Sequence, residues 1–154
     1  MAMKIQAESG ISKRLIIIDI ISLMNQITGY RLLIWSQDPD KLSSFYRDVL
    51  ELEEVIKLDI PDDYGYAFRV GDNGLLLWIG KHSDIEGPNK DPKRHMFNLY
   101  VDDVQSWYSK IKDREDVTIL QKPMVTPPTR DKEEKKYVCT FLDPEGNCFQ
   151  FMNP

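Results

Sequence analysis

Few side chains in this chain could take part in catalysis, because 154 residues include only two histidines and two cysteines. His82 lies in a polar stretch, and His95 begins an apolar one. Cys139 and Cys148 lack Cys-x-x-Cys spacing and would lie on adjacent strands, so a disulfide and free thiols both remain open, with free thiols favoured. No two titratable groups fall on one strand face at a spacing suited to acid–base catalysis.

A second group of residues is typical of a binding site. Alternate residues of a strand point to opposite faces, so one face of several expected strands collects the same kinds of side chain. These residues are Arg31, Leu33, Trp35, Trp78, Met96, Asn98, Tyr100, Cys148, Gln150 and Met152. An apolar, aromatic and sulfur-rich lining with a few polar groups is usual for a small-molecule site.

Arg31 is the residue expected to orient a ligand, because a guanidinium suits a carboxylate or phosphate. Trp35 and Trp78 would suit a flat ring or a cation. Each has a simpler interpretation: Arg31 pairs with an acid such as Glu51 or Glu53, and each tryptophan belongs to the core. His95 is interpreted as a surface residue at the start of a strand.

Two similar runs of elements must position these residues. The first has a strand over 30–36, a helix over 39–50 with Asp38 as N-cap, and strands over 53–60, 64–70 and 75–79. The second has a strand over 95–101, a helix over 104–112, a strand over 117–121, a charged loop over 122–136 and a hairpin over 137–152.

The pattern predicts an α+β domain over 30–154, built from two βαβββ modules at about 30–80 and 95–152 with a linker at 81–94. The bare faces of the two module sheets are predicted to pair into a curved eight-stranded cup. Residues 1–29 are interpreted as an N-terminal extension, with Met24 as an alternative start. The apolar run 15–24 is too short to span a membrane and Asp19 interrupts it.

Charge and composition narrow the classes of function. A net charge of −5 gives no basic surface for a nucleic acid, and the sequence predicts no membrane partner. No feature marks secretion, so we expect a cytoplasmic protein.

Three segments carry a resemblance to a known family. They are DPDKLSSFYRDVLEL at 38–52, YVDDVQSWY at 100–108 and FLDPEGNCFQF at 141–151. Together they resemble the glyoxalase, bleomycin-resistance and extradiol-dioxygenase superfamily, also called vicinal oxygen chelate (VOC) proteins. The resemblance implies paired βαβββ modules, a ligand cup and a homodimer.

The resemblance also implies where a metal would bind, on the first strand of each module and on the last. In this chain those positions hold Arg31, Met96 and Gln150, and the last strand of the first module offers leucines and Trp78. A guanidinium has no lone pair to donate, and a single amide is a weak ligand. We therefore expect no metal and no other cofactor.

The sequence favours metal-independent binding of a small anionic or aromatic molecule. The alternative is an enzyme, either a glyoxalase-like lyase, isomerase or dioxygenase with an altered ligand set, or a metal-free catalyst using Tyr100, His95 or Arg31. A third interpretation is a structural module whose cup is filled by its own side chains.

Overall fold

The computed structural model describes residues 29–126 and 135–154. Arg31–Pro154 form one compact unit. The first half contains β1 (Leu32–Ser36), α2 (Pro39–Ser44), a π-helical turn η1 (Phe45–Val49), β2 (Glu53–Ile60), β3 (Asp63–Val70) and β4 (Leu75–Lys81). The second half contains β5 (Met96–Tyr100), α3 (Val104–Ile111), β6 (Thr118–Val125), β7 (Tyr137–Leu142) and β8 (Cys148–Met152). The extension predicted at 1–29 and most of the loop predicted at 122–136 lie outside the described residues.

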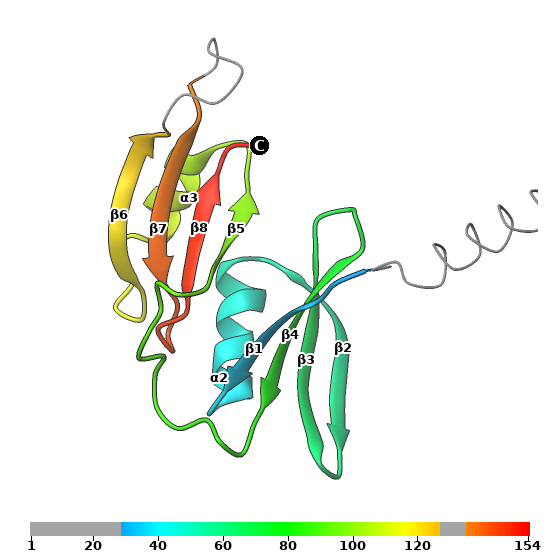
Figure 1. Ribbon diagram of the computed structural model, residues 1–154. Helices are drawn as coiled ribbons and strands as arrows, with labels where there is room; N and C mark the ends of the chain where they lie inside the picture. The colour runs from blue at the N-terminus through cyan, green and yellow to red at the C-terminus, as the bar shows by residue number, and fades with distance from the viewer. Residues whose placement is uncertain (1–28, 127–134) are drawn as a thin grey trace, which may run out of the picture. The chain divides into compact units, whose positions relative to one another are not determined.

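The prediction of an α+β fold with two βαβββ modules is confirmed. The eight strands form two four-stranded mixed sheets, ordered β1-β4-β3-β2 and β5-β8-β7-β6 (Figure 1). In each module the first strand pairs in parallel with the last, and the other pairs are antiparallel. The order leaves β1 and β5 as edge strands.

Both helices begin where the sequence predicts. The Asp38 carboxylate accepts a hydrogen bond from the Lys41 N–H at 3.1 Å, and Asp103 accepts one from Ser106 at 3.0 Å. The first helix does not stay α-helical to its end. It widens at η1, where the Leu50 N–H donates to the Phe45 carbonyl at 3.2 Å.

One expected boundary is wrong. The strand predicted to end at Gln121 continues as β6 to Val125, through Pro123. Proline lacks an N–H and normally interrupts a sheet, but β6 is an edge strand and its register shifts between Gln121 and Met124. The missing N–H of Pro123 therefore removes no hydrogen bond between strands in the interior of the sheet.

The two modules share an aromatic core. The Trp107 ring of α3 lies 5.0 Å from Phe151, centroid to centroid. From the first module, Phe45 lies 6.2 Å from Phe149 and Tyr46 lies 6.5 Å from Phe97. The first helical segment therefore packs against its own sheet and also against rings of the second sheet.

The two cysteines are free thiols, as the sequence favours, and the disulfide alternative is wrong. Cys139 lies opposite Phe151 in the sheet register, on the core face. Cys148 lies opposite Leu142, whose position has the other parity along β7. The two sulfur atoms therefore belong to opposite faces of one sheet.

The turn between β7 and β8, Asp143–Asn147, is a buried polar centre. The Asp143 side chain is 3% exposed and accepts hydrogen bonds from the N–H groups of Glu145 and Asn147, each at 2.9 Å. The Asn147 side-chain amide and the Tyr46 hydroxyl also donate to it, each reaching Oδ2 at 2.9 Å. Burial raises the pKa of Asp143, and these hydrogen bonds partly offset that rise.

The same turn holds the first module. The Ser36 hydroxyl donates to Glu145 Oε1 at 2.7 Å, and the Asp38 N–H donates to the same oxygen at 3.2 Å. The Asn89 N–H of the linker donates to the Glu145 carbonyl at 2.7 Å. Five residues of the second module therefore position the end of β1, the start of α2, Tyr46 and the linker.

We predict that Asp143→Ala lowers the free energy of unfolding by about 3 kcal/mol, because it leaves the buried Tyr46 hydroxyl and backbone donors without an acceptor. Tyr46→Phe should cost about 1–2 kcal/mol, since it keeps the packed ring and removes one hydrogen bond. Urea unfolding followed by circular dichroism measures both. Asp59→Ala, at an exposed position of β2, is the control, and equal values for Asp59→Ala and Asp143→Ala would contradict the central role of the turn.

Candidate functional site

Each sheet has one face away from the helices, here called its open face. Directly paired residues share a face. In the first sheet one row across the open face is Leu33, Trp78, Ala67 and Ile56. Leu32 and Ile34 face the core, so the predicted parity of the first strand is confirmed. The same register places Trp78 beside Leu33, on the face predicted from the sequence.

Trp78 is 6% exposed although it lies on the open face. Two glycines explain how it is covered. A Cβ added to Gly80 would lie 2.2 Å from Trp78 Nε1, and one added to Gly65 would lie 2.8 Å from Trp78 Cζ2. The indole therefore lies flat across backbone that carries no side chains.

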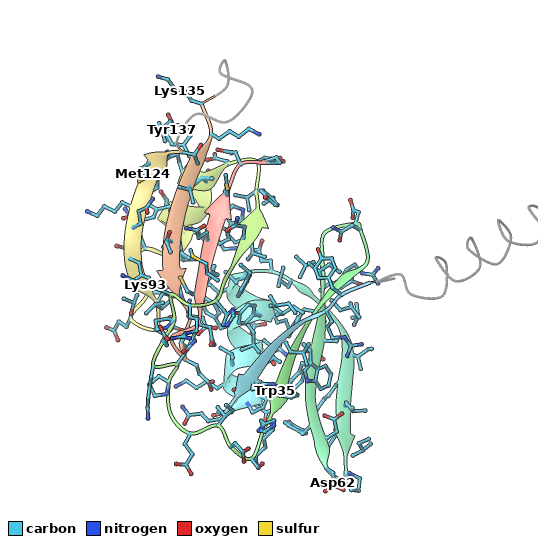
Figure 2. All side chains as sticks on the ribbon, viewed as in Figure 1. Trp35, Asp62, Lys93, Met124, Lys135 and Tyr137 are labelled. Atoms are coloured by element: carbon cyan, nitrogen blue, oxygen red, sulfur yellow. The ribbon has the colours of Figure 1, made fainter. Side chains whose placement is uncertain are left out.

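Trp35 lies on β1 (Figure 2). It is close to this indole, because a Cβ added to Gly80 would lie 3.0 Å from Trp35 Cζ3 as well as 2.2 Å from Trp78 Nε1. Its ring centroid is 5.1 Å from that of His82, at an interplanar angle of 58°. Trp35 is still 39% exposed. Trp78 is thus packed against the sheet, whereas part of the Trp35 side chain remains exposed.

The open face of the second sheet carries the other predicted site residues in three rows. Met96 lies opposite Cys148, Asn98 opposite Gln150, and Tyr100 opposite Met152. The Gln150 amide donates to the Thr140 hydroxyl at 2.8 Å, and the Asn98 amide contacts the Met152 sulfur at 3.9 Å. The middle row is therefore polar, between two rows that are largely apolar.

A groove of about 680 Å³ lies along the edge strands β1 and β5. Its lining consists of Leu32, Leu33, Ile34, Trp35, Asp84, Ile85, Glu86, Gly87, Pro88, Asn89, Lys90, His95, Met96, Phe97, Glu145, Asn147 and Cys148. Four predicted site residues are brought together there: Leu33, Trp35, Met96 and Cys148. The other predicted strand residues are on the open faces but do not line the groove: Trp78, Asn98, Tyr100, Gln150 and Met152.

The placement expected for Arg31, on the floor of the cup, is wrong. Arg31 precedes β1, is exposed, and does not line the groove. It forms no ion pair with Glu51 or Glu53 among the described residues; these pair with Lys110 and Arg69. An exposed guanidinium is hydrated and needs no ligand to balance its charge. The exposed position of Arg31 outside the groove therefore removes the reason to expect that it orients a carboxylate or phosphate there.

Most of the residues that line the groove were not predicted from the sequence. The linker residues Asp84–Lys90 form one wall, and Glu145 with Asn147 comes from the closing turn. His95, interpreted as a surface residue, is exposed and also lines the groove. The Gly-Pro and charged composition of the linker indicated only irregular structure, and the turn motif gave no sign that Glu145 borders a cavity.

The groove has little of what nucleophilic or metal chemistry requires. Burial raises the pKa of Cys148, which keeps its thiol protonated near neutral pH. Within 29–126 and 135–154, no cluster of three histidine, cysteine or acidic side chains is placed to hold a metal. Trp78 and Met96 lie on strands where the family resemblance implies metal ligands, but their side chains do not suit a hard cation, and the Gln150 amide is held by Thr140. The residues present do not fit the metal that the fold family implies.

The fold is that of an α+β protein with two βαβββ modules, and a groove runs along the edge strands β1 and β5. The sequence profile of the Glyoxalase/Bleomycin resistance protein/Dioxygenase superfamily matches residues 25–151, and the chain belongs to this superfamily. Comparison with curated proteins finds no match. No helix of the described residues is long and apolar enough to cross a membrane.

Solved structures share the fold. The hypothetical protein SA1046 from S. aureus has a TM-score of 0.65 and 18% identity, covering 87% of this chain and 99% of that one. A superfamily member from Sphaerobacter thermophilus DSM 20745 has a TM-score of 0.63 and 19% identity, covering 84% and 100%. Lactoylglutathione lyase from Agrobacterium tumefaciens has a TM-score of 0.57 and 19% identity, covering 83% and 94%. At these identities the likeness concerns the fold alone.

We predict that Gly80→Ala displaces the Trp78 indole, because the new Cβ would overlap it. Tryptophan emission should shift to longer wavelength, and unfolding should cost about 1–3 kcal/mol less, as for an overpacked site. Gly29→Ala is the control, since an added Cβ there meets nothing within 4 Å. Unchanged emission in Gly80→Ala would mean that Trp78 does not lie over the glycine.

Proposed function

We propose that this protein binds a small, flat, largely apolar molecule in the groove between β1 and β5, and does so without a metal. The observation that carries the proposal is the groove of about 680 Å³, with Leu33, Trp35 and Met96 presented along its wall. Ligand pockets commonly measure about 300–1,000 Å³ and combine an apolar wall with a few polar groups.

The chemistry of the lining supports a flat ligand. Trp35, which lines the groove, packs at an angle against the His82 ring, and Trp35 remains 39% exposed. A planar ring could stack on Trp35 at little entropic cost, since that side chain is already packed. Met96, 47% exposed on the opposite strand, has an unbranched side chain that adapts to different ligand shapes.

Binding accounts for these residues better than catalysis does. The Cys148 thiol has a raised pKa, and none of the family's metal positions carries a carboxylate or imidazole. His95 lines the groove, but it makes no side-chain hydrogen bond with a described residue that could orient it as a base.

We also propose that the protein is a homodimer in which a second copy covers the open faces. Large apolar side chains gather on these faces and remain exposed, including Ile56 at 47%, Tyr100 at 63% and Met124 at 49%. Large apolar side chains that remain exposed on a sheet face are typical of an interface. The family resemblance supports a second copy of the same chain as the partner.

A thermal-shift screen of aromatic acids, amines and antibiotics tests the binding proposal. A ligand at one hundred times its dissociation constant should stabilise the protein by roughly 2.7 kcal/mol, and EDTA or added divalent metals should not change the shift. Trp35→Ala should weaken a ligand by about 1–3 kcal/mol, whereas Leu120→Ala, at an exposed residue outside the groove, should not. A shift that appears only with metal would overturn metal independence.

Sedimentation at micromolar concentration tests the dimer. The 18.0 kDa chain should sediment as a dimer, and Tyr100→Glu should weaken association by roughly tenfold or more, because it places a charge in an apolar interface. Ser109→Glu introduces the same charge at an exposed position of α3 and should leave the dimer intact. A wild-type monomer throughout this range would refute the proposal.

A further inference from the structure

We propose that the groove selects ligands carrying a cationic nitrogen, which pairs with the carboxylate of Glu145. This inference rests on the proposed function, because it assigns a charge to the ligand of the same groove. It replaces the anion expected from Arg31, which does not line the groove.

Glu145 is an unusual carboxylate in this protein. It is 8% exposed, yet it forms no ion pair with a basic side chain among the described residues. Its two donors, the Ser36 hydroxyl and the Asp38 N–H, are neutral, and both reach Oε1. Buried carboxylates are normally paired with a positive group, and here none comes from the described chain.

The second oxygen, Oε2, is available to a ligand. It accepts no hydrogen bond from the described residues. Among the described residues, Ser43 Oγ is the only fully buried side-chain polar atom without a hydrogen-bond partner. Oε2 also has no partner, so it cannot be fully buried and must be in contact with open space. Because Glu145 lines the groove, that space is where an ammonium or guanidinium group could donate to it.

The remaining charges of the groove do not reverse this preference. Asp84 and Glu86 are acidic, Lys90 is basic, and His95 carries an imidazole; all four are exposed. Solvent and salt screen exposed charges, whereas a buried carboxylate is screened much less. The strongest electrostatic discrimination is therefore expected from Glu145, and Trp35 adds an aromatic face that also favours cations.

The competing explanation gives Glu145 a structural role only, joining the turn to β1 and α2. Glu145→Gln separates the two explanations, because glutamine keeps an oxygen for Ser36 and Asp38 but carries no charge. Glu86→Gln is the matched control, since it removes the same charge from an exposed position of the same groove.

Calorimetric titration of the full chain uses three probes with one ring system: naphthylmethylamine as cation, naphthylmethanol as neutral analogue and naphthoate as anion. The amine should bind about tenfold or more tightly than the alcohol, and naphthoate most weakly. In Glu145→Gln the advantage of the amine should fall below about threefold while the alcohol is unaffected, and Glu86→Gln should retain the wild-type order.

Three results would overturn the inference. If the alcohol or naphthoate binds as tightly as the amine, the groove does not select a cation, although the proposed function stands. If Glu145→Gln keeps the amine preference, the carboxylate is structural only. If no probe binds at millimolar concentration, the inference and the proposed function both fail. Should Glu145→Gln fail to fold, the order of the three probes on the wild-type protein still decides whether the groove selects a cation.

Discussion

The carboxylates of the turn Asp143–Asn147 are the constraint on which the arrangement of this domain depends. A buried carboxylate is costly unless its oxygens are satisfied, so each one specifies the position of its donors. Asp143 places Tyr46 and closes its own turn, and Glu145 places Ser36 and Asp38. One short segment near the end of the chain thereby determines how the first strand and helix sit against the second sheet.

The groove follows from that arrangement. Because β1 and β5 are edge strands, each ends its sheet without a neighbour on one side, and side chains there meet open space. The turn supplies Glu145 and Asn147 to the groove and holds the linker through Asn89. Glu145 therefore joins the two modules and also borders the cavity beside them, which is why its charge bears on ligand choice.

Membership in the superfamily specifies a scaffold more closely than a chemistry. In this chain, two strand positions at which the resemblance implies metal ligands carry Met96 and Gln150. Trp78 covers the part of the first sheet's open face that is formed by Gly65 and Gly80. A ring packed on the sheet in this way leaves Trp35 and the groove beside it as the accessible aromatic surface.

Local chemistry in the sequence determined most of the fold. Helix caps, turn residues and strand alternation each depend on only a few neighbouring residues, as at Asp38, Asp103 and Leu32–Ser36. Such local patterns predict the two modules and the side chains that face a helix. The exceptions have tertiary causes: β6 passes through Pro123 because it is an edge strand, and the helix widens at η1 within the shared core.

The site was decided largely by tertiary structure. Strand parity correctly predicted the strand faces on which Leu33, Trp35, Met96 and Cys148 lie, because parity is a local property of the backbone. It could not place Arg31, which precedes the strand, and it carried no information on Asp84–Lys90 or Glu145. Those residues reach the groove only because the turn hydrogen-bonds to Ser36, 109 positions away from Glu145, and to the linker. Contacts of such long range depend on how buried charges are satisfied across the whole domain, which no local pattern encodes.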